Sequence, residues 1–376
     1  MIFKEKSMAS KVFFTDMHVG MNSSLLDKFR RLIDRAGIAE IDFMDKFVAV
    51  KLHFGEVGNM AFLRQQYARV LCDRIKELGG KPFLTDCNTL YVGYRNNALN
   101  HLDAAYMNGY NPLATGVHTI IADGLRGTDE REIPVEGGEY VKTAKIGAAI
   151  AEADIVISLT HFKGHVNAGF GGCLKNIGMG AGSKKGKMEM HSSGTPRISK
   201  KRCIGCGMCV RHCNNSGVNV IDGKAVIDED KCVGCGYCIA YCPMDAIMTK
   251  WDEAKPVMNK KIAEYTKAVI SGKPSFHISM VIDVSPECDC DSCNDVPVIP
   301  DIGMFASFDP VALDQACVDA ANSAPIVPGS AADKGGEHEH GHDLFRIVHP
   351  DTDWEAGLIH AEKIGLGTRE YELVRM

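Results

Sequence analysis

The sequence predicts an α/β fold, a mostly parallel sheet body with an inserted cysteine-rich α+β module. Two observations predict it. Strand and helix signals alternate from residue 11 to residue 160, as in proteins built on a parallel sheet. A cysteine-dense stretch then has folded-looking sequence on both sides. We therefore expect a first part of the body at 8–195, the insert at 196–251 and a second part of the body at 252–376.

The first part of the body contains five runs of β-type residues. We expect strands at residues 11–14, 47–53, 82–85, 117–122 and 155–160. Apolar residues at helical spacing predict a helix that Asn22 caps and Gly37 ends. Two further helices are expected at 60–78 and 144–151.

The second part of the body continues the pattern. We expect a helix at 258–269, a strand at 276–284 and a closing helix at 354–364. Asp309-Pro310 opens another helix, with the aspartate as N-cap and the proline at the first helical position. Residues 322–343 form a Gly/Pro/His-rich loop, in which the acidic and histidine run 337–342 could bind a divalent metal weakly or simply be solvated.

The composition excludes several classes of protein. The 376 residues are 45% hydrophobic and 24% charged, which is the usual globular balance. The net charge of −6 gives no nucleic-acid or membrane-surface signature. No apolar run approaches the roughly 18 residues of a membrane span, and the N-terminus is not a secretory signal. We expect a cytoplasmic protein that binds neither nucleic acid nor membrane.

Eight of the fifteen cysteines form an internal repeat. Each half has the spacing C-x2-C-x2-C-x3-C, and the offset between the halves is constant (232 − 203 = 29). This spacing resembles the bacterial two-cluster ferredoxins, in which the fourth cysteine of each half ligates the other cluster. The resemblance implies one 4Fe–4S cluster on Cys203, Cys206, Cys209 and Cys242, and a second on Cys232, Cys235, Cys238 and Cys213. A zinc ribbon would need only four cysteines. Between the halves, residues 218–227 predict a hairpin that turns at Asp222-Gly223.

Polar side chains recur where the predicted strands end. Because the carboxyl ends of parallel strands meet at one edge of a sheet, we expect these side chains to surround one crevice. Each alone could be a cap or turn residue. The chain positions are His53, Asp86, Asp123, His161 and His165. Of these, the three histidines are candidates for proton transfer, and Asp86 is a candidate for orienting a histidine or a metal.

A glycine-rich, lysine-bearing segment at 161–187 follows the fifth strand. We expect a loop whose backbone N–H groups and ammonium charges bind an anion, with Lys163, Lys175 and Asn176 as candidate donors. The alternative is a flexible connector that leads into the insert. Basic residues continue to Arg202, either as a solvated face or as a docking patch for an acidic redox partner.

A second cysteine group follows the insert. Cys288, Cys290 and Cys293 place three thiols within six residues. They could ligate a third metal, either zinc or a further iron–sulfur cluster. The alternative is free thiols on a turn.

Several stretches together resemble the domain of unknown function 362 family, often labelled as 4Fe–4S binding proteins. The matching stretches are Val50-Lys-Leu-His-Phe-Gly-Glu56, Leu84-Thr-Asp-Cys-Asn-Thr-Leu-Tyr91, Ile121-Ala-Asp-Gly124, His161-Phe-Lys-Gly-His165, Gly169-Phe-Gly-Gly172, Leu174-Lys-Asn-Ile-Gly-Met-Gly180, Cys288-Asp-Cys290 and Ser307-Phe-Asp-Pro-Val-Ala-Leu-Asp314. The resemblance implies an iron–sulfur protein with an α/β body, and it implies no reaction.

Two functions remain open. The first is an iron–sulfur oxidoreductase that relays electrons between two 4Fe–4S clusters and a small anionic substrate or a metal site in the crevice. The second is a non-catalytic ferredoxin-type electron carrier or maturation factor whose body docks a partner protein. A carrier would not need histidine, aspartate and lysine side chains that converge at several strand ends. A nucleic-acid-binding role is disfavoured by the negative net charge.

Overall fold

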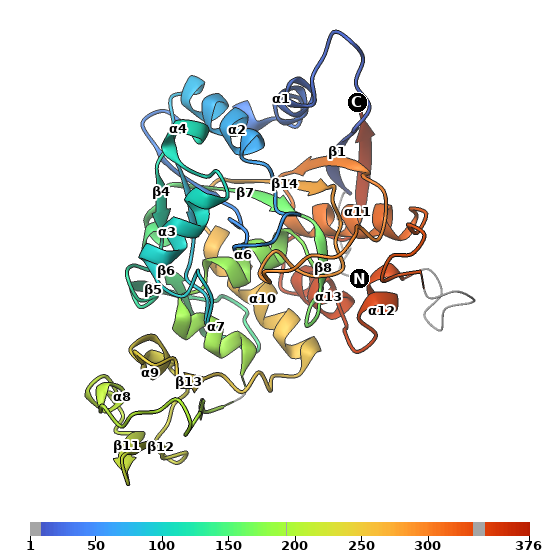
Figure 1. The fold of residues 1–376 in the computed structure, drawn as a ribbon. Helices are drawn as coiled ribbons and strands as arrows, with labels where there is room; N and C mark the ends of the chain where they lie inside the picture. The colour runs from blue at the N-terminus through green and yellow to red at the C-terminus, as the bar shows by residue number, and fades with distance from the viewer. Residues whose placement is uncertain (1–8, 193, 334–342) are drawn as a thin grey trace, which may run out of the picture.

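The protein is built around one eight-stranded sheet (Figure 1). This computed structural model describes residues 9–192, 194–333 and 343–376. The strands lie in the order β16-β1-β15-β14-β7-β2-β3-β4, and only the two pairs that involve β15 are antiparallel. The sheet is therefore mostly parallel, as predicted. Its strands are β1 (Ser10–Asp16), β2 (Phe47–Lys51), β3 (Lys81–Asp86), β4 (Thr119–Ile121), β7 (Ile155–His161), β14 (Ser275–Val281), β15 (Gly303–Ser307) and β16 (Tyr371–Arg375).

Helices cover both faces of this sheet. All seven residues of β7 are buried, because Ile155 and Ile157 face one hydrophobic core and Val156 faces the other. Helices α1 and α2 pack on the first face, whereas α6, α10 and α11 pack on the second (Figure 1). The helices of the body are α1 (Leu25–Arg35), α2 (Gln65–Glu77), α3 (Ala98–Met107), α4 (Pro112–Thr115), α5 (Ala148–Glu152), α6 (Cys173–Ala181), α7 (Lys184–His191), α10 (Lys255–Ile270), α11 (Pro310–Asn322), α12 (Leu344–Val348) and α13 (Glu355–Lys363), with a 3-10 turn at Ile38–Glu40.

Three predicted helix boundaries are wrong. Helix α1 starts after Ser24, not Asn22, because Ser24 and Asp27 form a reciprocal capping box. Helix α2 starts at Gln65 because Asn59 is held out of it by bonds from its side-chain amide to the Asp291 and Cys293 carbonyls. The first half of the predicted helix at 144–151 is strand β6 (Thr143–Gly147), which pairs with β5 (Glu130–Pro134), and only the second half is helical, in α5.

The glycine-rich segment is not a loop. It forms a hairpin of β8 (Lys163–His165) and β9 (Gly169–Gly171), followed by α6 and α7. The Asp314 carboxylate caps α6 by accepting hydrogen bonds from Cys173 N at 2.6 Å and Leu174 N at 2.9 Å. A Cβ at Gly178 would lie 2.2 Å from the Ile262 carbonyl of α10, so this glycine allows two helices to pack closely.

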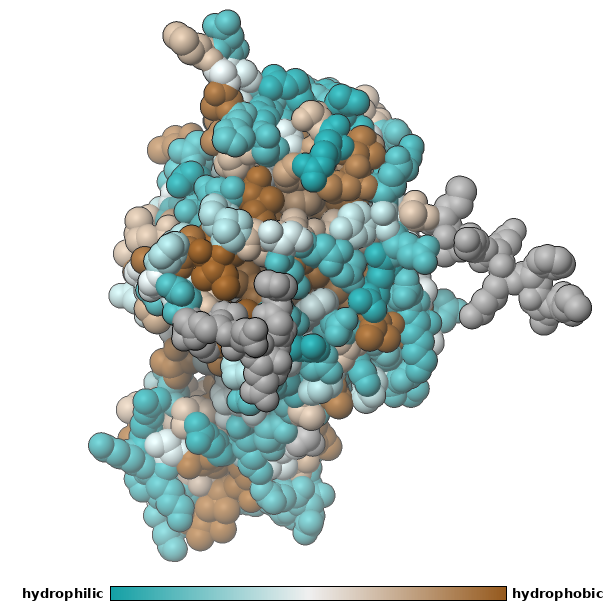
Figure 2. All heavy atoms as spheres, turned by 90° about the vertical axis from the view of Figure 1, so that its right-hand side faces the viewer, coloured by the Kyte–Doolittle hydropathy of each residue, from teal (hydrophilic) through white to brown (hydrophobic). Residues whose placement is uncertain are grey.

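The cysteine-rich stretch forms a small lobe with its own core (Figure 2). Strands β10 (Arg197–Ile198) and β13 (Ile247–Met248) pair antiparallel and hold its two ends together. The predicted hairpin is confirmed as β11 (Val218–Ile221) and β12 (Lys224–Ile227), with positive φ at Asp222 and Gly223. Two short helices, α8 (Met208–Arg211) and α9 (Tyr237–Ala240), complete the lobe.

Two further expectations concern the acidic and histidine run and membrane-spanning helices. The acidic and histidine run at 337–342 lies outside the described residues. Among the described residues, no helix combines the length and the apolar character that crossing a membrane requires.

Candidate functional site

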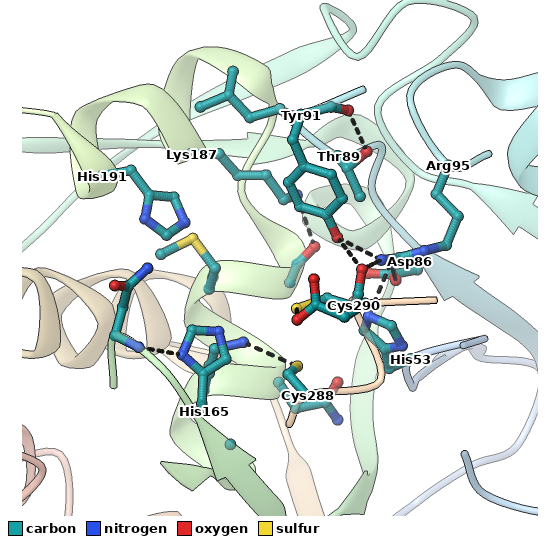
Figure 3. A pocket seen from close by; sticks show the side chains of 18 of the residues that line it. His53, Asp86, Thr89, Tyr91, Arg95, His165, Lys187, His191, Cys288 and Cys290 are labelled. Carbon is teal, nitrogen blue, oxygen red and sulfur yellow. Dashed lines mark hydrogen bonds and ion pairs between the residues drawn. The ribbon is translucent and has the colours of Figure 1, made fainter. Parts of the chain in front are cut away.

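A cavity of about 220 Å³ lies at the carboxyl ends of β2, β3 and β7 (Figure 3). The structure brings six of the eight candidate crevice residues to its wall. They are His53, Asp86, Lys163, His165, Lys175 and Asn176. Asp123, two residues after β4, and His161, the last residue of β7, do not line the cavity.

His161 instead contacts Asp289, the residue between Cys288 and Cys290. Its Nδ1 lies 2.9 Å from the Asp289 carboxylate, and its Nε2 bonds the Ile282 carbonyl at 2.8 Å. Lys163 pairs with the other Asp289 oxygen at 3.0 Å. Burial opposes ionisation of Asp289, but the charges of His161 and Lys163 outweigh it and lower the pKa of this carboxyl. The charge of Lys163 is thus already partnered.

The opposite wall holds a second ion-pair group. Lys51 is 1% exposed and lies 3.0 Å from Asp86, and its ammonium also donates to Asn176 Oδ1 at 2.9 Å. Arg95 pairs with Glu56 at 3.0 Å. Sequence reasoning missed Lys51 and Arg95, although a lysine inside an apolar strand was an available signal for the first.

His53 is held neutral between donors. Burial lowers its pKa well below the ordinary value, and the charge of Arg95 adds to that effect. Gly55 N donates to its Nδ1 at 3.0 Å, and Arg95 Nη1 lies 2.8 Å from its Nε2. Since a guanidinium can only donate and a neutral imidazole accepts at one nitrogen, His53 accepts a full hydrogen bond from only one of these two donors.

Lys175 provides the accessible positive charge. Within the described part of the chain it forms no ion pair with a carboxylate, and its Nζ lies 3.8 Å from Cys288 Sγ. A ring nitrogen of His165 and the sulfurs of Cys288 and Cys290 lie within 4.8 Å of one another. Cys293, which the sequence grouped with Cys288 and Cys290 as a possible metal ligand, is exposed and lies outside this group. The third member of the group is His165 instead.

The eight cysteines of the repeat line two small cavities in the lobe. One is lined by Cys203, Cys206, Cys209 and Cys242, and the other by Cys213, Cys232, Cys235 and Cys238. Each cavity therefore receives three cysteines from one half of the repeat and one from the other. Backbone N–H groups donate to three of the sulfurs, on Cys203, Cys213 and Cys242, at 3.1–3.3 Å.

A hollow of about 500 Å³ separates the first cysteine cavity from the crevice. It shares Cys242 and Pro243 with that cavity. It shares Leu90, Tyr91 and Trp251 with the crevice. The crevice wall also includes His191, whose ring lies 4.6 Å from that of Trp251. His191 precedes the lobe in sequence and Trp251 is its last residue, so residues at both ends of the lobe line the crevice.

Comparison with known proteins yields one family and several distant solved structures, two of which follow. The family described as Domain of unknown function (DUF362) matches residues 48–319, and no curated protein matches. The structure of the lactate racemase apoprotein from Thermoanaerobacterium thermosaccharolyticum is 14% identical, with a TM-score of 0.40 over 72% of this chain and 51% of that one. A Thermotoga maritima protein is 13% identical, with a TM-score of 0.35 over 79% of this chain and 58% of that one. The chain thus spans between half and three-fifths of these structures, and neither likeness bears on function.

Proposed function

This chain belongs to the DUF362 family, a domain of unknown function, and from that premise we propose that it is an iron–sulfur oxidoreductase. Two 4Fe–4S clusters in the lobe would exchange electrons with a small anionic substrate in the crevice. The family description assigns no reaction, so the proposal rests on the site itself.

The observation that carries the proposal is the pair of cysteine cavities. Four soft sulfur ligands around one small cavity suit an iron–sulfur cube, and the division of three and one is that of two-cluster ferredoxins. The first cavity is otherwise lined by apolar side chains and glycine backbone, with no competing carboxylate or histidine. The N–H donors to Cys203, Cys213 and Cys242 suit sulfurs that carry negative charge.

The crevice residues would bind and orient the substrate. Bound clusters would supply the electrons for the reaction. Lys175 offers an ammonium with no carboxylate partner among the described residues, and the buried walls exclude much of the water that would screen it. Burial and the charge of Lys175 lower the pKa of His165 and keep its ring neutral, so this histidine would offer the substrate a hydrogen bond.

A non-catalytic electron carrier is the second candidate. Ile204 and Val233 occupy equivalent positions in the two halves of the repeat (233 − 204 = 29), and they are 62% and 67% exposed. Apolar side chains beside both cysteine loops would suit contact with a redox partner protein. Both functions need the clusters, whereas only the first needs the crevice.

Iron and sulfide analysis of anaerobically purified protein tests the shared premise. We expect about eight iron and eight sulfide per chain, two cubes of four. Cys242→Ala should damage the cluster held by Cys203, Cys206 and Cys209, which EPR can separate from the other cluster. Cys293→Ser is the matched control, because Cys293 is exposed and lies outside both cavities. Four or fewer iron with stoichiometric zinc would rule the proposal out.

A further inference from the structure

The segment Cys288-Asp289-Cys290 is clamped so that both thiols reach the wall of the crevice. Asp289 is fully buried and held by His161 and Lys163. The backbone is fixed as well: Glu56 N donates to the Asp289 carbonyl at 2.8 Å, and Tyr91 Oη donates to the Cys290 carbonyl at 3.1 Å. Two thiols one residue apart, on a rigid backbone, therefore face the same space (Figure 3).

The hydrogen bonds of His165 argue against a metal at this point. Asn167 N and Ala168 N both donate to its Nδ1, each at 3.1 Å. A histidine that ligates a metal through one nitrogen almost always donates an N–H from the other. Here Nδ1 accepts, so the proton of the neutral ring resides on Nε2. His165 therefore donates a hydrogen bond from Nε2, and a metal held by Cys288 and Cys290 would lack its third protein ligand.

Cys288 is built to be a thiolate. The neighbouring Cys290 thiol lowers the pKa of Cys288 below that of an ordinary thiol; burial opposes this effect, and the charges of Lys175 and Lys163 reinforce it. The geometry is consistent with this, because Lys175 Nζ lies 3.8 Å from Cys288 Sγ and has no carboxylate partner among the described residues. A thiolate beside a thiol is the arrangement that thiol–disulfide exchange requires.

We propose that Cys288 and Cys290 are a redox-active dithiol that reduces a small anionic disulfide in the crevice. The Cys288 thiolate attacks one sulfur of the substrate disulfide, which forms a mixed disulfide and expels the first product thiolate. The Cys290 thiol gives its proton to that product, which leaves as a thiol, while His165 Nε2–H donates a hydrogen bond to the departing sulfur. The Cys290 thiolate then attacks Cys288 Sγ, and the second product leaves as a thiolate.

The products of one cycle are one thiol, one thiolate and the Cys288–Cys290 disulfide. Restoring the dithiol takes two electrons and one proton, and for this supply the inference rests on the proposed function. The substrate class follows from the wall: a cavity of about 220 Å³ admits only a small molecule, and Lys175 favours one that carries a carboxylate.

The test is the redox state of the two thiols. Cys293→Ser protein, in which the tryptic peptide after Lys267 keeps only Cys288, Cys290 and Cys317 of its thiols, is equilibrated anaerobically in glutathione buffers of defined potential. It is then alkylated and analysed by mass spectrometry. We expect loss of two alkylation sites at Cys288 and Cys290 with a single midpoint. Cys288→Ser in the same background should lose the transition.

Substrate selection is tested with dithiodiglycolate, a small disulfide that carries two carboxylates. It should oxidise the dithiol in the Cys293→Ser protein, and Lys175→Met should slow this oxidation roughly ten- to hundredfold by removing one charge-assisted contact. Lys175→Met also weakens the Cys288 thiolate and should slow both disulfides, so the anionic contact is measured as the additional slowing of dithiodiglycolate over uncharged 2-hydroxyethyl disulfide. Equal slowing for both disulfides would overturn the assignment of an anionic substrate.

Two results would overturn the dithiol itself. One is that Cys288 and Cys290 stay alkylated at every potential. The other is a stoichiometric metal ion that Cys288→Ser releases. Iron and sulfide measured on the same samples keep the two proposals apart. A reversible disulfide in protein without clusters would support the dithiol and refute the iron–sulfur function, whereas full clusters with an inert pair would do the reverse.

Discussion

Asp123 is a carboxylate with no exposed surface at the end of β4. Burial raises its pKa to about 6, against hydrogen bonds from Asn88 and the charge of Lys187. Between about pH 4 and pH 6 the folded protein therefore binds a proton that the unfolded chain has released. The contribution of Asp123 to the free energy of unfolding is greatest below this window and falls as pH rises through it.

Asp123→Asn should remove that dependence. A shift of about two units corresponds to roughly 3 kcal/mol across the window. Urea unfolding between pH 4.5 and pH 7 should show a smaller loss of stability in the variant than in the parent protein. Asp129→Asn, at a carboxylate whose side chain is 61% exposed, should leave the slope unchanged. Identical slopes for the parent and Asp123→Asn would contradict the assignment.

At the level of single residues, the sequence predicts which side chains line the crevice better than it predicts their hydrogen-bond and ion-pair partners. Strand-end positions placed His53, Asp86 and His165 at one cavity, because parallel strands share an edge. The same rule could not show that His161 turns toward Asp289, since that contact joins positions 128 residues apart. Nor could it show that Lys163 is neutralised by the same carboxylate.

At the level of elements, helix α6 depends on its glycines for its position. Gly178→Ala would place a methyl group 2.2 Å from the Ile262 carbonyl and 2.7 Å from Thr266 Oγ1 of α10. Overpacking of this kind costs about 1–3 kcal/mol and outweighs the roughly 1 kcal/mol that alanine gains in a helix. We expect a lower midpoint in urea unfolding, together with weaker anion binding, because Lys175 and Asn176 lie on the same helix.

Gly182→Ala is the control for this prediction. Its nearest neighbour would be the terminal methyl of Met190 at 3.0 Å, which can move. A Gly178→Ala protein as stable as the parent would mean that α6 and α10 can move apart without lowering the free energy of unfolding.

The elements that the sequence missed owe their structure to distant contacts. Helix α6 is rich in glycine, so its own residues favour a loop, and its cap is Asp314, about 140 residues away. Strand β15 has a weak β-type sequence and pairs antiparallel with both β1 and β14. Its strand conformation therefore depends on hydrogen bonds to these two neighbours. The predicted strands, in contrast, carry β-branched or aromatic residues, which are enriched in strands.

At the scale of the whole molecule, the lobe and the body differ in how far the sequence specifies them. The lobe is a repeat with fixed spacing, so its hairpin and cysteine cavities follow from local pattern. The proximity of the lobe to the crevice does not. It arises where Leu90 and Trp251, from segments far apart in sequence, line both the crevice and the adjoining hollow.

The last prediction is that residues 196–251 assemble clusters on their own. Each cysteine cavity draws all four thiols from within the lobe, and β10 pairs with β13, so the cut ends lie side by side. Paired residues of antiparallel strands have Cα atoms about 5 Å apart, so a short Gly/Ser linker can rejoin the body. Among the residues that the structure describes, only Leu90 and Met188 of the body enter the core of the lobe, and their loss should lower stability more than cluster content.

The excised lobe, reconstituted anaerobically, should take up about eight iron, and the rejoined body should unfold cooperatively without iron. The body should still form the Cys288–Cys290 disulfide. Within the described part of the chain, no residue of the lobe is hydrogen-bonded to either cysteine. An excised lobe that takes up no iron, beside an intact protein that does, would mean that Leu90 and Met188 are required to hold the cysteine loops. The clusters and the crevice would then form one folding unit, and the lobe could not have been added to the body as an independent module.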